Sequence, residues 1–122
     1  KEIVRVSSGR GCMFRCSFCH NSFEYKLYHK KYFHRKFSVE YLVFMLPYYK
    51  KRYNPKKIEF EEDHFVVNKE WLQEFSYYYP REVGLPFYCY LNPSVVNKEI
   101  VKMLKKAGCV EVYQGFDAAN DD

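Results

Sequence analysis

Three cysteines stand close together near the start of the 122-residue chain, in the order Cys12-x3-Cys16-x2-Cys19. They follow a β-branched run at residues 3–7 and a turn of serine, glycine and arginine at residues 8–11. Thiols this close on one segment can bind one metal centre, but no fourth cysteine lies nearby in the sequence. Structural zinc sites and iron–sulfur clusters commonly have four protein ligands. The spacing therefore predicts a metal centre that lacks one protein ligand, and an open position of that kind is where metal chemistry takes place.

The composition narrows the class of protein. Hydrophobic residues make up 48% and charged residues 29%, which is typical of a globular chain rather than a disordered one. The cysteine count is five, and an odd number with three in one short segment fits a disulfide scaffold poorly. We therefore expect a reducing compartment, the cytoplasm, and neither a signal peptide nor a membrane helix. The net charge of +5 permits an anionic partner without requiring one.

Hydrophobic patterning predicts strands that alternate with helices after the first strand. Alternation or β-branched character indicates four strands, at residues 3–7, 57–61, 87–91 and 110–116. Helix-capping residues precede three helical patterns, namely Ser38, Asn68 and Asn97, and Gly108 ends the last. Strands that alternate with helices favour an α/β fold whose strands pair in parallel through right-handed crossovers.

Two features of this pattern carry further expectations. Pro47 is expected to kink or break the first of these helices, and Pro80 to end the second. Residues 8–37 show no clear period, so we expect a long connection without regular structure. Connections of that length inside a compact domain are commonly functional, and this one carries the three cysteines.

Polar residues follow each predicted strand. Ligands of parallel α/β folds bind at the carboxyl ends of the strands. The second strand leads to Glu61, Glu62 and Asp63, of which strand alternation allows only some to point inward. The later strands lead to Asn92 and to a last group, Gln114 with Asp117. Together with the cysteines, these residues predict a site at one rim of the sheet.

The cysteine segment resembles the cluster-binding motif of the radical S-adenosylmethionine (radical SAM) enzymes, C-x3-C-x-aromatic-C, with Phe18 in the aromatic position. Residues 58–65, IEFEEDHF, are similar to the second-strand motif of the cobalamin-associated branch of that family, and residues 104–117 are similar to its third helix and fourth strand. The resemblance implies a partial (β/α) barrel of about four parallel strands with three crossover helices. Because such cores usually have six units and the chain begins at Lys1 rather than Met, residues 1–122 are expected to be the N-terminal part of a truncated barrel.

The resemblance also implies cofactors and a reaction. Cys12, Cys16 and Cys19 would bind a [4Fe-4S] cluster whose fourth iron binds S-adenosylmethionine. An electron, from a reductant such as flavodoxin or ferredoxin, would cleave S-adenosylmethionine to a 5′-deoxyadenosyl radical. That radical would act on an unknown substrate, or the site would support radical methyl transfer. Cobalamin, if used, would be bound by a domain outside this chain. No catalytic side chain is assigned.

The same resemblance suggests cofactor contacts. Phe18 would pack near the adenine, and Glu62 or Asp63 would receive the methionine ammonium, a cation that a carboxylate binds well. Asn92 stands where the family often has arginine. Gln114 precedes a segment in which Asp117 replaces the usual glutamate.

The competing hypothesis is a zinc-stabilised binding module whose fourth ligand is His20, His29 or His34. Aromatic and basic residues interleave over residues 25–36, a composition suited to stacking on RNA and contacting its phosphates. We favour a cover over the cluster for this segment and keep nucleic-acid binding as the alternative. Cys89 and Cys109 are interpreted as small buried hydrophobic residues, and His64 is interpreted as structural or exposed rather than as a ligand.

Overall fold

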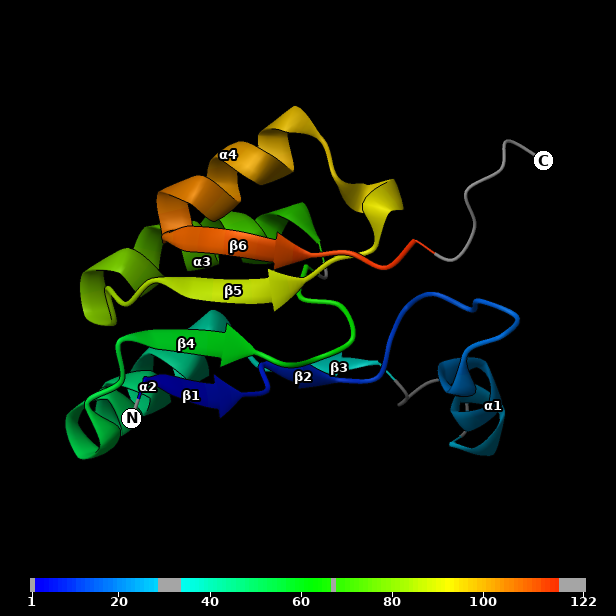
Figure 1. Cartoon of the computed structure of the whole chain (residues 1–122), viewed down its shortest axis with the longest axis horizontal. Coiled ribbons are helices and arrows are strands. Elements are labelled where there is room, and N and C mark those ends of the chain that lie inside the picture. Colours follow the sequence, from blue (N-terminus) through cyan, green and yellow to red (C-terminus); the bar gives the residue numbers. More distant parts are fainter. Residues whose placement is uncertain (1, 29–33, 67, 117–122) are drawn as a thin grey trace.

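The computed structural model describes residues 2–28, 34–66 and 68–116 of the chain, in which strands and helices alternate (Figure 1). The elements are β1 Ile3–Val6, β2 Gly9–Arg10, α1 His20–Leu27, β3 Arg35–Lys36, α2 Val39–Tyr53, β4 Lys57–Phe60, α3 Lys69–Glu82, β5 Phe87–Tyr90, the short 3-10 helix η1 Pro93–Val95, α4 Lys98–Ala107 and β6 Cys109–Tyr113. The four predicted strands and three predicted helices are all present, with bounds that differ by a few residues.

The main sheet has the strand order β1-β4-β5-β6, and every neighbouring pair is parallel. Each connection between neighbouring strands passes through a crossover helix, α2, α3 or α4, as parallel pairing requires. The first connection, from β1 to β4, also contains β2, α1 and β3. The register places Val4 beside Ile58 and Ile58 beside Phe87. The predicted α/β fold with four parallel strands and three crossover helices is confirmed, and it is consistent with part of a barrel.

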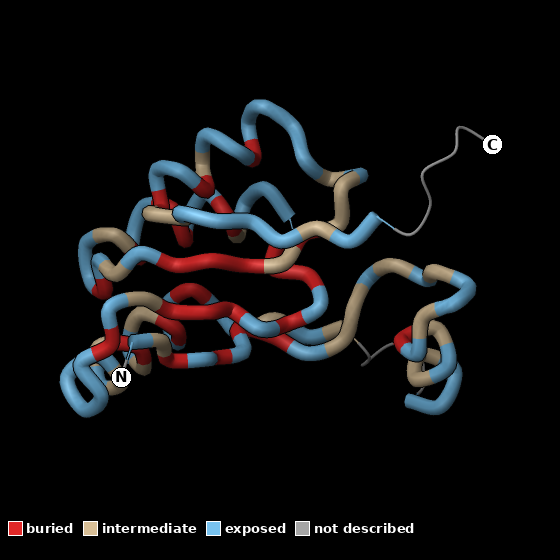
Figure 2. The backbone as a smooth tube through the Cα atoms, in the orientation of Figure 1, coloured by how far each residue is buried: buried red, intermediate tan, exposed pale blue. Residues whose placement is uncertain are grey.

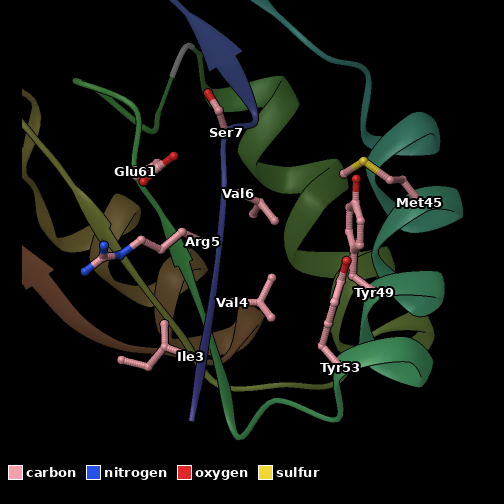
Figure 3. Close-up of a pocket in the computed structure, with 9 residues that line it drawn as sticks. All are labelled: Ile3, Val4, Arg5, Val6, Ser7, Met45, Tyr49, Tyr53 and Glu61. Atoms are coloured by element: carbon pink, nitrogen blue, oxygen red, sulfur yellow. The ribbon is translucent and has the colours of Figure 1, made fainter. Parts of the chain in front are cut away.

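The two faces of the sheet differ in chemistry. Figure 3 shows Val4 and Val6 of β1 pointing toward Met45 and Tyr49 of α2, whereas Arg5 points away from that helix. The central strands β4 and β5 each have three consecutive buried residues, so both of their faces are covered (Figure 2). The helix-facing core combines aliphatic side chains with a cluster of aromatic rings, which make contacts among Phe60, Phe65, Phe75, Tyr79 and Phe87.

The helix caps form as the sequence predicts. The Ser38 hydroxyl accepts a hydrogen bond from the Tyr41 N–H at 3.2 Å, and the Asn68 side chain accepts one from the Trp71 N–H at 2.8 Å. Gly108 ends α4 with φ of 97°, the left-handed conformation that glycine adopts without strain. No helix within the described ranges is long and apolar enough to cross a membrane.

Neither proline interrupts its helix, so the break that the sequence allows at Pro47 and the helix end that it predicts at Pro80 are both wrong. α2 continues past Pro47 to Tyr53, and α3 continues past Pro80 to Glu82. The packing of Leu46 holds the first helix together, since that residue is fully buried. At the end of α3 the carbonyl of Tyr79 accepts hydrogen bonds from the N–H groups of Val83 and Gly84 at 2.9 and 3.0 Å. Tertiary packing thus outweighs the helix-breaking cost of proline, about 3 kcal/mol.

The connection predicted to lack regular structure contains α1 and a small antiparallel ribbon of β2 with β3. Gly9 allows the ribbon to close, because a Cβ atom there would lie 2.6 Å from the Arg35 carbonyl oxygen. The N–H of Phe37 donates to the carbonyl of Ser8 at 2.9 Å and closes the base of the connection. Strands of two residues have no period to detect, and the N-cap residue of α1, Cys19, makes no side-chain cap hydrogen bond. Neither element therefore has a signal in the local sequence.

Candidate functional site

The three cysteines line one hollow of about 270 Å³ at the carboxyl ends of the strands. Figure 1 shows the segment after β2 running beyond the arrowheads of the main sheet, next to α1. Phe14 and Asn21 from the same segment complete that side of the hollow. The opposite side is formed by residues at the ends of β4, β5 and β6: Asp63, Tyr90, Leu91, Asn92, Pro93, Tyr113 and Gly115. The structure therefore brings residues from all four strand ends to one site, as predicted from strand topology.

A tight turn holds two of the cysteines. The N–H of Cys19 donates to the carbonyl of Cys16 at 3.0 Å, and the hydroxyl of Ser22 donates to the same carbonyl at 2.8 Å. α1 begins at the next residue, His20. The turn fixes the backbone between the second and third thiol, which are both half-buried.

Glu62 anchors the base of the cysteine segment. Its carboxylate accepts hydrogen bonds from the N–H of Ser8 at 3.1 Å and from the Ser8 hydroxyl. It also forms an ion pair with the ammonium of Lys36 at 2.6 Å, and both side chains are nearly inaccessible, at 4% and 7% exposure. Ser8 precedes the segment and Lys36 follows it, so one carboxylate ties its two ends together.

Lys36 lies in a dry environment. Its ammonium donates to the carbonyl of Phe65 at 2.6 Å and lies 4.5 Å from the ring centres of both Phe65 and Trp71. Burial lowers the pKa of Lys36, and the neighbouring Glu62 carboxylate opposes that shift. The Glu62 carboxylate therefore serves as the counter-ion of Lys36 in a buried ion pair.

Asp63, in contrast, is exposed and faces the thiols. The amide of Asn21 donates to its carboxylate at 3.1 Å and to the sulfur of Cys19 at 3.6 Å. Asn21 is 4% exposed and belongs to α1, so it links the cysteine segment to the end of β4. Of the two acids predicted to receive a cation, Asp63 lies in the hollow and Glu62 lies beneath it.

The thiols act on one another electrostatically. Burial raises the pKa of Cys12, a hydrogen bond with the Phe14 backbone opposes this, and the charges of Asp63, Cys19 and Cys16 raise the pKa further. Among residues 2–28, 34–66 and 68–116, no three His, Cys, Asp or Glu side chains converge closely enough for a single metal ion. A [4Fe-4S] cluster needs a different arrangement, because each thiolate binds a separate iron. Three half-buried thiols around one hollow are a donor set that fits such a cluster.

The other predicted site residues are distributed unevenly. Asn92 lines the hollow, where its side-chain oxygen caps η1 by accepting from the N–H and hydroxyl of Ser94 at 2.9 and 2.7 Å. Phe18 is 69% exposed in the turn and does not line the hollow. Gln114 lies between two lining residues without lining it itself. Asp117 lies outside the described residues, as does His29.

His64 is buried and structural, as the sequence predicts. Its Nδ1 accepts the N–H of Asn92 at 3.2 Å, and its ring meets Phe14 edge-on at 5.1 Å. Its Nε2 has no hydrogen-bond partner in the part of the chain described. Burial, with the Lys36 charge, lowers the pKa of His64 to about 4. The neutral ring therefore packs between the cysteine segment and the end of β5.

Sequence reasoning missed several residues of the site: Ser8, Phe14, Asn21, Lys36, Tyr90 and Tyr113. Their roles depend on partners that are distant in sequence. Asn21 and Asp63, for example, form a hydrogen bond although they are 42 positions apart. Within the basic aromatic segment 25–36, residues 29–33 lie outside the described part, so the structure does not test its function. Its described neighbour Arg15 lies over the ring of Tyr25 at 3.7 Å.

Comparison with known proteins gives two matches. The sequence model of the Radical SAM superfamily matches residues 6–122, which is nearly the whole chain. The chain is also 30% identical, over 116 residues, to an uncharacterized methyltransferase of Pyrococcus horikoshii. That alignment covers 94% of this chain and 24% of the relative, so the chain spans about a quarter of the relative's length.

The buried pair predicts a large loss of stability when its anion is neutralised. Glu62→Gln leaves the Lys36 ammonium buried without a counter-charge, and we expect the free energy of unfolding to fall by about 3 kcal/mol. Urea titration measures this loss. Glu2→Gln is the control, because it breaks an exposed pair with Lys56 whose removal costs less than about 1 kcal/mol. Equal losses in the two variants would contradict the anchoring role of Glu62.

The lowered pKa of His64 predicts that the free energy of unfolding depends on pH. The unfolded ring binds a proton below about pH 6.5, whereas the folded ring does so only near pH 4. The unfolded state therefore binds more protons in this window, and the free energy of unfolding should fall by about 2 kcal/mol between pH 7 and pH 5. Urea titrations at both pH values, on the protein without metal, measure this change. His64→Gln should remove most of it, and an unchanged pH dependence in that variant would contradict the assignment.

Proposed function

The chain belongs to the radical SAM superfamily, and on that basis we propose that Cys12, Cys16 and Cys19 bind a [4Fe-4S] cluster at which S-adenosylmethionine is cleaved. One observation supports this most strongly. Three half-buried thiols line the same hollow as an exposed carboxylate, at the carboxyl ends of parallel strands. The protein is an enzyme by family. For the zinc-module alternative, the described residues place no three His, Cys, Asp or Glu side chains around one metal ion.

When bound, the reduced cluster supplies the electron that cleaves the sulfonium of S-adenosylmethionine. The residues of this chain would bind the cluster and orient the side chains around it. The thiolates hold the iron, the Asn21 amide holds Cys19 and Asp63 in place, and the packing of Phe14 on His64 shields the inner side of the segment from water. The Glu62–Lys36 pair fixes the two ends of the segment.

Within this proposal, Asp63 binds the ammonium of the methionine moiety. Its carboxylate is exposed to the hollow and is held by one amide donor. Glu62 is unsuitable, because its carboxylate already accepts from Ser8 and pairs with Lys36. An exposed carboxylate loses little hydration when a fixed cation binds, and the resulting charge-assisted hydrogen bond is strong.

The finer reaction is also a proposal. The name of the Pyrococcus horikoshii relative supports methyl transfer as the outcome. The acidic motif at the end of β4 supports the cobalamin-associated branch, in which cobalamin would be bound outside residues 1–122. A one-electron donor of the flavodoxin or ferredoxin type would reduce the cluster. Cobalamin in the protein as isolated, detected by its absorbance, tests the assignment to that branch.

The cluster proposal predicts that loss of any one cysteine prevents cluster formation. Each of Cys12→Ser, Cys16→Ser and Cys19→Ser should abolish the electron paramagnetic resonance signal that the unmodified protein gives after anaerobic reconstitution with iron and sulfide and reduction. Cys109→Ser is the control, since that thiol lies at the amino end of β6, away from the hollow. Stoichiometric zinc in place of iron, or a signal that survives all three changes, would refute the proposal.

The assignment of Asp63 predicts a separable effect on cofactor binding. Asp63→Asn should leave the cluster signal intact but weaken S-adenosylmethionine binding by about tenfold, because it removes one charge-assisted hydrogen bond. Equilibrium dialysis with radiolabelled S-adenosylmethionine measures the dissociation constant. Glu61→Gln, a neutralisation at a neighbouring exposed position, should have little effect. Equal weakening by the two variants would assign the effect to net charge rather than to Asp63.

A further inference from the structure

The sheet face opposite the helices carries two rows of polar and aromatic residues that the proposed cluster site does not use. Residues paired across parallel strands point to the same face. The register pairs Arg5 with Glu59 and Glu59 with Tyr88, which forms the first row. The second row, one pleat nearer the strand ends, pairs Tyr90 with Tyr113. The second row reaches the hollow, and the first lies behind it.

Glu59 is the centre of these rows. It is 6% exposed, yet its carboxylate has three donors. The guanidinium of Arg5 donates to Oε2 at 2.6 Å, and the Tyr88 hydroxyl donates to the same oxygen at 2.7 Å. The Tyr90 hydroxyl donates to Oε1 at 3.0 Å. A buried carboxylate with this many donors fixes the orientation of each one.

The protonation states support this arrangement. Burial alone would raise the pKa of Glu59, but hydrogen bonds from Tyr88, Arg5 and Tyr90 outweigh it, and the pKa lies below its usual value. Burial and the bond to Glu59 raise the pKa of Tyr88 to about 12, and the bond to Glu59 raises the pKa of Tyr90. Over the ordinary pH range the carboxylate therefore accepts and both phenols donate.

Tyr90 connects Glu59 to the wall of the hollow. Its ring lines the hollow and stacks on Tyr113, with ring centres 5.3 Å apart and planes 27° apart. Tyr113 is 40% exposed and also lines the hollow. Tyr88 donates to the same carboxylate and its ring meets Tyr113 edge-on at 5.3 Å, but Tyr88 does not line the hollow. Of the three donors to Glu59, Tyr90 is the one that lines it.

We propose that the Tyr90–Tyr113 pair is the surface on which the purine ring of S-adenosylmethionine stacks, and that Glu59 is a positioning residue that holds Tyr90 there. The proposal rests on the cofactor assignment made above. Flat aromatic rings stack favourably on tyrosine, and the stacking of a base does not depend on which base it is. Phe18, the aromatic residue expected from the sequence to meet the adenine, is directed largely to solvent, whereas this pair faces the site.

The test measures binding to the cluster-reconstituted full chain by equilibrium dialysis. The probes are S-adenosylmethionine and S-adenosylhomocysteine, which share the purine and differ in the sulfonium. Tyr90→Ala should weaken both by about tenfold, within the range that base stacking on an aromatic side chain contributes. Tyr90→Phe removes the hydrogen bond to Glu59 and should weaken binding of both probes by about threefold. Glu59→Gln exchanges the charged acceptor for a neutral amide oxygen and should weaken binding of both probes by no more than Tyr90→Phe does. Tyr88→Phe, which removes a bond to the same carboxylate away from the hollow, should change neither.

A double variant separates positioning from general destabilisation. Because Glu59 acts through the Tyr90 hydroxyl, Glu59→Gln combined with Tyr90→Phe should bind no more weakly than Tyr90→Phe alone. Additive losses, unchanged binding in Tyr90→Ala, or a loss confined to S-adenosylmethionine would overturn the proposal. If the unmodified protein forms its cluster but binds neither probe, the cofactor assignment fails together with this inference. If it binds both and the variants do not differ from it, only this inference fails.

Discussion

The cysteine segment depends on one buried ion pair. A segment of more than twenty residues carries the three thiols, and its ends meet where Glu62 accepts from Ser8 and pairs with Lys36. Lys36 is further held by the Phe65 carbonyl and by two aromatic rings, so the pair is enclosed by the same core that supports the sheet. The position of the thiols therefore follows from the stability of the core.

The two faces of the sheet have different roles: one packs the core, and the other carries residues of the proposed site. The helix-facing side is packed with aromatic rings around Phe60 and supplies stability. The other side places Glu59, Tyr90 and Tyr113 below the hollow, and the strand ends add Asp63 and Asn92. In parallel α/β folds this arrangement lets the site residues differ between relatives without disturbing the core.

Much of the fold could be predicted from the sequence, because its signals are local. Alternation marked the strands, Ser38, Asn68 and Asn97 marked helix starts, and the cysteine spacing marked the site. The predictions failed where distant contacts decide the outcome, as at the two prolines and in the two-residue strands of the ribbon. Glu62 and Asp63 are adjacent in sequence. Their roles differ because Glu62 contacts Ser8, which is 54 positions away, and so distant a contact leaves no local signal in the sequence. Tyr90 and Tyr113 are two of thirteen tyrosines, so composition concealed them. The roles of the cysteines in cofactor binding stay predictions.

The central claim is that the hollow holds a cluster with one iron open to S-adenosylmethionine. Mössbauer spectroscopy of protein reconstituted with ⁵⁷Fe, recorded with and without S-adenosylmethionine, tests it most directly. The claim predicts that addition of S-adenosylmethionine makes one iron spectroscopically distinct from the three held by thiolates. A spectrum that does not change on addition, or a protein that takes up zinc and no iron, would contradict it.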